Sequence, residues 1–221
     1  MLKKKLKNLI TIANFHKVGA KNKRNGNKLE SATAKQFSKW YGNEFHRSPG
    51  SGSLHWHSIN VDADVLPPND LDFPFIIECK SSNGKSWSLE NFMQSNQHFP
   101  EWSAQAVREA VAVGKIPLLV FKRNYVKSFV SFPYTNNAFK SLLIKGIPVT
   151  ISHIKYVSEI DKSKVDYLSI ACWLDQIMGN YKPKEFEKLF DKNWQVVLNK
   201  TEVKKHPDKS INELLEGIDL K

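Results

Sequence analysis

The stretch Phe73-Pro-Phe-Ile-Ile-Glu-Cys-Lys80 has the composition of a buried β-strand that ends in charged residues. Successive side chains of a strand point to opposite faces, so this stretch divides into two sets. One set is wholly apolar and is expected in the core: Phe73, Phe75, Ile77 and Cys79. The other set contains Ile76, Glu78 and Lys80, which places a carboxylate beside an ammonium group. An ordinary salt bridge at a strand end has the same pattern, so Glu-x-Lys alone defines no function.

The residues before this stretch supply further carboxylates. Asp62 and Asp64 lie two residues apart in Asn60-Val-Asp-Ala-Asp-Val65 and share one strand face. Asp64 lies 14 residues before Glu78, a spacing that allows a hairpin to return one strand beside the other. Asp64 and Glu78 would then meet on adjacent strands, although Asp62 competes with Asp64 for this place. Two nearer carboxylates fall in a turn and rank lower, namely Asp70 and Asp72.

Such a pair of carboxylates is suited to a hard divalent cation. Mg²⁺ binds through one or two carboxylates together with substrate phosphate and water, and Mn²⁺ is expected to replace it. The ion would polarise the phosphate and acidify a bound water. Lys80 would place positive charge where negative charge develops in the transition state. A third carboxylate, Glu30, lies near the start of the first expected helix and could complete the cluster or orient a metal-bound water.

Positive charge is concentrated at the N-terminus. The 221 residues include 33 Lys and Arg against 22 Asp and Glu, a net charge of +11. Residues 1–28 hold nine basic residues and no acidic residue, so nine of these net charges lie there. A basic arm is typical of a protein that binds a polyanion, because each neutralised phosphate releases condensed counterions. A solubilising tail and a membrane-surface helix are alternative interpretations.

A turn-rich loop over Arg47–Ser53 offers a second contact for phosphate. It contains Ser48-Pro-Gly-Ser-Gly52, whose backbone N–H groups can face a phosphate, although a plain flexible loop has the same composition. Phosphate contacts are expected from side chains of the arm and of this loop, namely Lys21, Lys23, Arg24, Arg47 and Ser51.

The composition excludes several classes of protein. Apolar residues make up 41% of the chain, which is enough for a sizeable core. The longest apolar stretches, such as Ile116–Phe121, are far shorter than the roughly 20 residues that cross a bilayer. Two cysteines cannot form a disulfide framework, and a reducing, cytoplasmic setting is the simple interpretation. The sequence has no Walker loop, dinucleotide fingerprint or Ser-His-Asp pattern.

The order of the expected elements describes an α/β sandwich in which helices flank a central mixed sheet. Helices are expected over Leu29–Tyr41, Glu101–Val113, Val165–Met178 and Pro183–Asp191. Strands are expected over Leu54–Val65, Phe73–Lys80, Ile116–Arg123, Lys127–Phe132 and Val149–Val157, with Asp64 at the end of the first. We expect a basic arm over residues 1–25, a core over 26–160 and a helical C-terminal extension over 161–221.

Other His, Trp and Cys patterns do not define a specific site. His55 and His57 share a strand face, but no third or fourth ligand stands at a spacing typical of zinc sites. Tryptophans such as Trp56, Trp87 and Trp102 could stack on unpaired bases, although most tryptophans belong to the core or its rim. Cys172 lies on an apolar face and is interpreted as a buried thiol.

These motifs, taken in order, resemble the PD-(D/E)xK nuclease superfamily, most closely phage and archaeal Holliday-junction resolvase-like members. The resemblance covers residues 26–124. Its elements are Gly26-x-x-x-Glu30, the Ser48–Gly52 loop, Ala63-Asp-Val65, Ile77-Glu-Cys-Lys80, the helix around Trp102-Ser-Ala-Gln105 and the strand Pro117–Lys122. A proline that precedes the aspartate in many members is missing before Asp64, a departure that the family tolerates.

The resemblance implies a restriction-endonuclease-like core and a role for each matching residue. Asp64 and Glu78 correspond to the metal-binding carboxylates, with the backbone carbonyl of Cys79 as a further ligand. Lys80 corresponds to the catalytic lysine, and Glu30 to the acid of the first helix. Gln105 is similar to a helix glutamine that supports the site in related nucleases.

The implied activity is a Mg²⁺-dependent DNA endonuclease that acts in DNA recombination on branched DNA such as a Holliday junction. Symmetric cleavage of a junction needs two sites, so a homodimer is expected. If the chain is phage-encoded, it would act in the host cytoplasm. A restriction-type or end-processing DNA nuclease is the first alternative. A non-catalytic DNA-binding or virion protein with a decayed site is the second, and the intact carboxylates and lysine argue against it.

Overall fold

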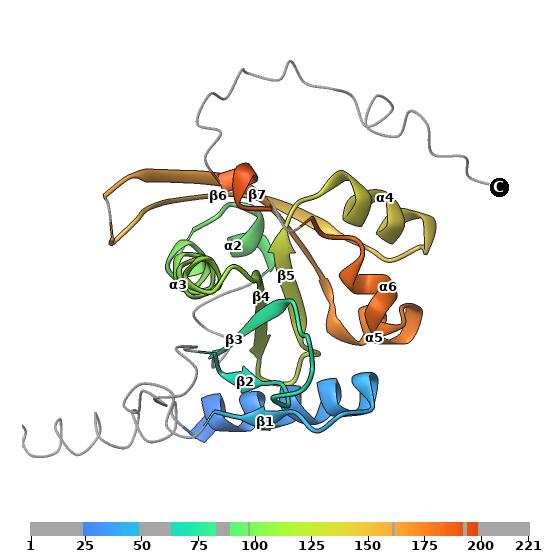
Figure 1. Cartoon of the computed structure of the whole chain (residues 1–221). Helices are drawn as coiled ribbons and strands as arrows, with labels where there is room; N and C mark the ends of the chain where they lie inside the picture. The colour runs from blue at the N-terminus through green and yellow to red at the C-terminus, as the bar shows by residue number, and fades with distance from the viewer. Residues whose placement is uncertain are drawn as a thin grey trace, which may run out of the picture.

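A computed structural model describes residues 24–48, 63–82, 89–96, 98–160, 162–191 and 194–198. Within these residues, seven strands form one sheet in the order β1-β2-β3-β4-β5-β7-β6 (Figure 1). The strands are β1 (His46–Arg47), β2 (Val65–Leu66), β3 (Phe75–Ser82), β4 (Ile116–Arg123), β5 (Phe129–Pro133), β6 (Thr150–Val157) and β7 (Lys164–Trp173). The sheet is mixed, because β3 and β4 are parallel whereas all other neighbours are antiparallel.

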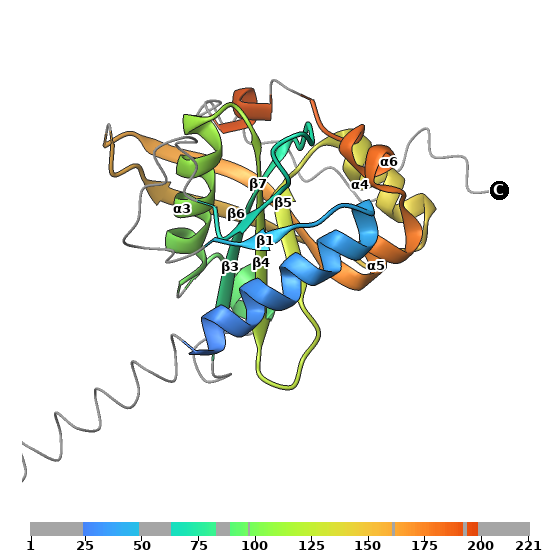
Figure 2. The same ribbon diagram turned by 60° about the horizontal axis from the view of Figure 1, so that its bottom comes forward.

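The parallel pair at the centre requires a crossover, and two helices supply it. α2 (Leu89–Met93) and α3 (Phe99–Ala112) lie between β3 and β4 in the chain and on one side of the sheet (Figure 1). A helix over residues 24–41 crosses the sheet in front of β3 and β4 (Figure 2). The remaining helices are α4 (Asn136–Ile144), α5 (Leu174–Asn180), α6 (Pro183–Glu187) and the 3₁₀ helix η1 (Trp194–Leu198).

Aromatic packing holds the helix over residues 24–41 to the apolar face of β3. The ring centroids of Phe37 and Phe73 lie 6.1 Å apart, and those of Phe73 and Phe75 lie 5.5 Å apart. Phe75 also packs against Phe186 of α6, at 5.7 Å. The expected apolar face of this strand is therefore the core, and its opposite face is left for Glu78 and Lys80. The Cys79 side chain faces the core as expected, because its thiol is buried beside Thr33.

Most of the expected elements are present with shifted ends. The first helix is helical from residue 24, five residues before its expected start, and the Glu-x-Lys strand runs from Phe75 to Ser82 rather than from Phe73 to Lys80. Of the strand expected over Leu54–Val65, residues 54–62 lie outside the described residues, and β2 extends past Asp64 to Leu66. The α/β class with a mixed sheet is confirmed.

The helix expected over Val165–Met178 is wrong. Residues Lys164–Trp173 form β7, which lies between β5 and β6, and only Leu174–Asn180 is helical. Four successive residues of β7, Ser169–Cys172, are buried, so both faces are covered there and the sequence loses the alternation that identifies a strand. The division of the chain into arm, core and extension stays a prediction, and β7 requires any boundary after the core to follow Trp173.

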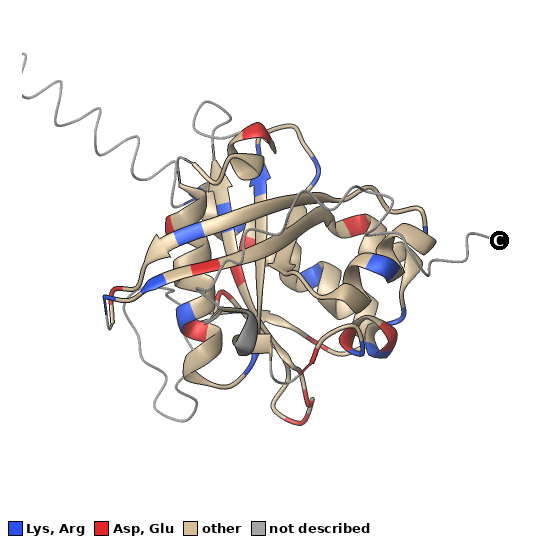
Figure 3. Cartoon of the chain, turned by 90° about the horizontal axis from the view of Figure 1, so that it is seen from above, with Lys and Arg blue, Asp and Glu red and all other residues tan. Residues whose placement is uncertain are grey.

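No helix among the described residues is long and apolar enough to cross a membrane. Seen from above, acidic and basic residues are interspersed over this part of the chain (Figure 3). This mixture agrees with the sequence, in which most of the net positive charge lies in residues 1–28.

Candidate active site

Asp64 and Glu78 lie together at the point where β2 begins beside β3. The backbone N–H of Asp64 donates to the carbonyl of Ile77 at 3.0 Å, and its Oδ2 accepts from the N–H of Cys79 at 2.8 Å. Asp64 is thus bonded to the residues on both sides of Glu78. Both acids are buried, with 8% of Asp64 and 2% of Glu78 exposed.

This position corrects the expectation that Asp64 ends its strand. Asp64 precedes β2, and β2 runs antiparallel to β3. In an antiparallel pair, the start of one strand lies beside the later part of the other. Asp64, just before β2, therefore lies beside Glu78 in the middle of β3. An aspartate at the end of β2 would instead lie beside the start of β3, away from Glu78.

Lys80 connects the acids to α3. Its Nζ donates to Glu78 Oε1 at 2.5 Å and to Gln105 Oε1 at 2.7 Å. The structure thus brings Gln105 to the site, as the resemblance implied. An amide has one oxygen acceptor and one nitrogen donor, so a partner for Gln105 Nε2 determines which end faces Lys80.

That partner is Glu109, a residue that the sequence analysis missed. Gln105 Nε2 donates to Glu109 Oε1 at 2.9 Å, and Glu109 Oε2 is buried without a hydrogen-bond partner among the described residues. Glu109 lies four residues after Gln105 on α3, and such residues are neighbours on one helix face. This spacing is the signal that could have identified Glu109 once Gln105 was assigned.

Glu30 and Arg47 form a second group at the edge of the site. Glu30 is 6% exposed, and its Oε2 accepts from the Arg47 guanidinium at 3.1 Å. The residue after Arg47, Ser48, donates its N–H to the carbonyl of Asp64 at 2.9 Å, which joins β1 to the site. Arg47 therefore compensates the charge of Glu30, a contact that the sequence analysis did not anticipate.

Burial raises the pKa of every carboxyl group in the site. The pKa of Glu78 lies well above the ordinary range because of burial and the charges of Asp64 and Glu109, which Lys80 only partly offsets. Burial likewise raises the pKa of Asp64, although the hydrogen bond from the Cys79 N–H and the charge of Lys80 lower it in part. Burial and the charge of Asp64 raise the pKa of Glu30, although the hydrogen bond and the charge of Arg47 lower it in part. The nearby cations therefore do not fully offset burial, and the ionised form of each carboxyl group is disfavoured.

The donor atoms fit a hard divalent cation. Burial disfavours the charged form of both Asp64 and Glu78, and the charge of Asp64 disfavours that of Glu78 further, so a bound cation would stabilise both carboxylates. Among the described residues, however, no group of three or more His, Cys, Asp or Glu side chains has a metal-binding arrangement. The protein side chains thus offer two carboxylates, a number that Mg²⁺ sites with substrate phosphate and water employ.

Several expected site residues lie outside the described residues: Lys21, Lys23, Ser51, His55, Trp56, His57, Asp62 and Trp87. Arg24 is exposed at the first described position of its helix. The ring of Trp102 stacks on His98 at 5.7 Å and packs against Phe99 at 5.1 Å, so it is a rim residue of the core. Cys172 is buried, as expected.

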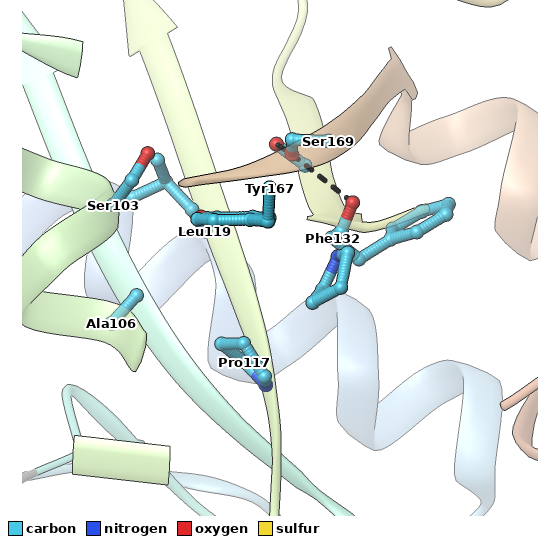
Figure 4. Close-up of a pocket in the computed structure, with 9 residues that line it drawn as sticks. Ser103, Ala106, Pro117, Leu119, Phe132, Tyr167 and Ser169 are labelled. Atoms are coloured by element: carbon cyan, nitrogen blue, oxygen red, sulfur yellow. Dashed lines mark hydrogen bonds between the residues drawn. The ribbon is translucent and has the colours of Figure 1, made fainter. Parts of the chain in front are cut away.

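A small cavity beneath α3 is lined by none of the residues of this acidic site. Ser103 and Ala106 of α3 line it together with Pro117, Leu119, Tyr167 and Ser169 of the sheet (Figure 4). A hydrogen bond from Ser169 Oγ to the carbonyl of Phe132 crosses its wall at 3.1 Å. None of its lining residues is charged, so the cavity offers no chemistry for a phosphate or a metal ion.

A mixed α/β sheet that carries a buried Asp/Glu pair and a Glu-x-Lys strand defines a PD-(D/E)xK nuclease core. In agreement, the model of the family described as "Phage putative PDDEXK endonuclease" matches residues 21–188. The chain therefore belongs to this family, which confirms the superfamily indicated by the sequence. Searches of curated proteins and of solved structures gave no match. Membership suggests a nuclease that acts on DNA, and such nucleases generally use divalent metals.

Proposed function

We propose that the protein is a Mg²⁺-dependent DNA endonuclease whose centre consists of Asp64, Glu78 and Lys80. The observation that carries the proposal is that Asp64 is hydrogen-bonded to Ile77 and Cys79, the residues on either side of Glu78, while Lys80 is bonded to Glu78 itself. Two carboxylates that can hold a metal ion and a cation that can stabilise developing negative charge suit phosphodiester hydrolysis by a metal-activated water, and they stand within one hydrogen-bonded cluster.

Asp64, Glu78 and the backbone carbonyl of Cys79 would hold the ion. When bound, Mg²⁺ would polarise the scissile phosphate and lower the pKa of a water. Lys80 supplies a positive charge for the oxygens of the reacting phosphate, and Gln105 holds its ammonium in place at 2.7 Å. Glu109 orients Gln105 through the bond at 2.9 Å, and Arg47 keeps the Glu30 carboxylate beside the site. Lys80 is thus held by two hydrogen bonds, one to Glu78 and one to Gln105.

The proposed substrate is branched DNA, for which the resemblance to Holliday-junction resolvases is the support. The basic arm over residues 1–25 would bind the DNA backbone together with Arg47 and Ser51. Two such sites in a homodimer would cut a junction symmetrically. A restriction-type or end-processing nuclease would have the same centre, so the substrate must be identified by experiment.

The deciding experiment incubates the purified chain with linear, flapped and four-way DNA of matched sequence. We expect cleavage with Mg²⁺ or Mn²⁺, none with EDTA, and a preference for the four-way substrate. Glu78→Ala should abolish cleavage, whereas Glu101→Gln, which alters an exposed carboxylate on α3, should leave it unchanged. Cleavage that persists in EDTA or in Glu78→Ala would show that the proposed centre is wrong. Equal cleavage of all substrates would refute only the preference for branched DNA.

A further inference from the structure

The end of β4 and the first residues after it, residues 122–127, expose an aromatic side chain in an unusual backbone conformation. We name these residues the basic turn, because they read Lys-Arg-Asn-Tyr-Val-Lys. Tyr125 is fully exposed, at 104% of its reference area, and its φ is +65°. Bulky side chains rarely adopt this left-handed conformation, for which turns usually select Gly, Asn or Asp. Neither the backbone conformation nor packing explains a tyrosine here.

The basic turn is anchored to the sheet. The N–H of Val126 donates to the carbonyl of Arg123 at 3.3 Å and closes the turn around Tyr125. The N–H of Asn124 donates to the carbonyl of Ser82, the last residue of β3, also at 3.3 Å. Val126 packs against the core. Tyr125 is therefore presented to solvent from a fixed support.

The basic turn extends from the end of the sheet that carries the catalytic lysine. In the parallel pair, Lys80 lies beside Phe121, and Ser82 lies beside Arg123. Ser82 is two residues past Lys80, or about 7 Å along the strand. The turn projects from the end of β4 past the helix over residues 24–41 (Figure 2). The turn therefore begins beside Ser82, just beyond Lys80 on the same strand end.

The charges around Tyr125 fit a nucleic acid strand. Lys122 and Arg123 are partly exposed and have no acidic partner among the described residues, whereas Lys127 is paired with Asp175 at 2.6 Å. Cations that follow a phosphate backbone, combined with an aromatic ring on which a base stacks, are the common means of binding single-stranded DNA. A continuous duplex offers no unpaired base to such a ring.

We propose that Tyr125 stacks on an unpaired base of the DNA substrate near the phosphate held at Lys80, while Lys122 and Arg123 contact the neighbouring phosphates. This proposal rests on the proposed nuclease function and deepens it. The basic turn would be the element that distinguishes DNA with unpaired bases, such as flapped or gapped DNA, from continuous duplex.

Binding measurements in EDTA test this proposal without cleavage. Fluorescence anisotropy would compare a continuous duplex with the same duplex carrying a gap of three unpaired nucleotides. Tyr125→Ala should weaken binding of the gapped DNA by about 5- to 140-fold, the loss of one stacked base, and change duplex binding less than about twofold. Tyr125→Trp should retain the affinity. Ile160→Ala, which removes another exposed apolar side chain in the β6–β7 connection, should change neither affinity.

Folding defects are separated from binding defects by Tyr125→Gly. Glycine adopts a positive φ readily, so this variant should unfold at no lower temperature than the original chain but bind gapped DNA as weakly as Tyr125→Ala. The proposal would be overturned if Tyr125→Ala left the affinity for gapped DNA unchanged, or if it lowered the affinity for both DNAs equally. The basic turn would then bind a protein partner or have no binding role. Selective binding of gapped DNA by a chain that cleaves nothing would support the role of Tyr125 and refute the nuclease. Failure to bind any DNA would refute both.

Discussion

The buried carboxylates are expected to cost the protein stability when no cation is bound, and Glu78→Gln tests this directly. Two unit charges about 5 Å apart at an effective dielectric constant of about 20 repel by about 3 kcal/mol. Glu78 lies beside two acids, Asp64 and Glu109, and its one bonded cation is Lys80. Glutamine keeps the volume and an oxygen that accepts from Lys80 while it removes the charge. We expect Glu78→Gln to abolish cleavage and to raise the free energy of unfolding by about 1–3 kcal/mol in EDTA.

The pH dependence has a defined sign. Because the pKa of Glu78 is raised by folding, the folded chain holds a proton that the unfolded chain releases. The contribution of Glu78 to stability is therefore fully present below the ordinary carboxyl pKa near 4.5 and is lost as the pH rises through the raised pKa of the folded state. In EDTA, Glu78→Gln should lose less stability than the original chain over the same rise in pH. The slope will not vanish, because the pKa values of Asp64, Glu30 and Glu109 are also raised.

Thermal unfolding, followed with and without Mg²⁺, measures these effects. For a chain of this size, 1 kcal/mol corresponds to about 2–4 °C in Tm. An ion at ten times its Kd adds about 1.4 kcal/mol, so the original chain should gain stability from Mg²⁺ and Glu78→Gln should not. Glu101→Gln, which alters a carboxylate whose side chain is 78% exposed, is the control and should behave like the original chain. The reasoning is refuted if Glu78→Gln is less stable in EDTA and gains as much from Mg²⁺.

Three further predictions address the roles of individual residues and of the basic arm. Asp64→Asn should eliminate cleavage and calorimetric Mn²⁺ binding while DNA binding persists, whereas Asp62→Asn should keep measurable activity. The reverse result would exchange the two roles without refuting the nuclease. Glu109→Gln should lower kcat about tenfold or more and leave KM little changed. The physical reason is that the amide of Gln105 is then free to turn away from Lys80. A variant with full kcat would show that Glu109 does not orient Gln105. Deletion of residues 1–23 should weaken DNA binding and flatten the plot of log affinity against log salt by about 0.9 for each lost phosphate contact, so an unchanged slope would exclude the arm from the interface.

The sequence predicts the centre of the fold well because the pattern there is strong and local. Period-two alternation separates Phe75 and Ile77 from Glu78 and Lys80, and the structure places the first pair in the core and the second beside Gln105. The prediction fails at β7, where the burial of four successive residues, Ser169–Cys172, removes the alternation that identifies a strand. The position of Asp64 in its strand was also wrong, because β2 has only two described residues and its limits depend on pairing with β3.

Glu109 shows why a site is harder to predict than its strands. Nothing in the sequence around Glu109 distinguishes it from an exposed acid on an amphipathic helix, because its role depends on a distance of 2.9 Å to an amide that itself faces Lys80. That chain of contacts joins residues 29 positions apart and exists only once α3 packs on β3. A network of this kind has one consistent arrangement of donors and acceptors, since Lys80 can only donate and a Glu109 carboxylate can only accept. The amide of Gln105 is the one member with two orientations, so Glu109 determines the geometry of the lysine without touching it.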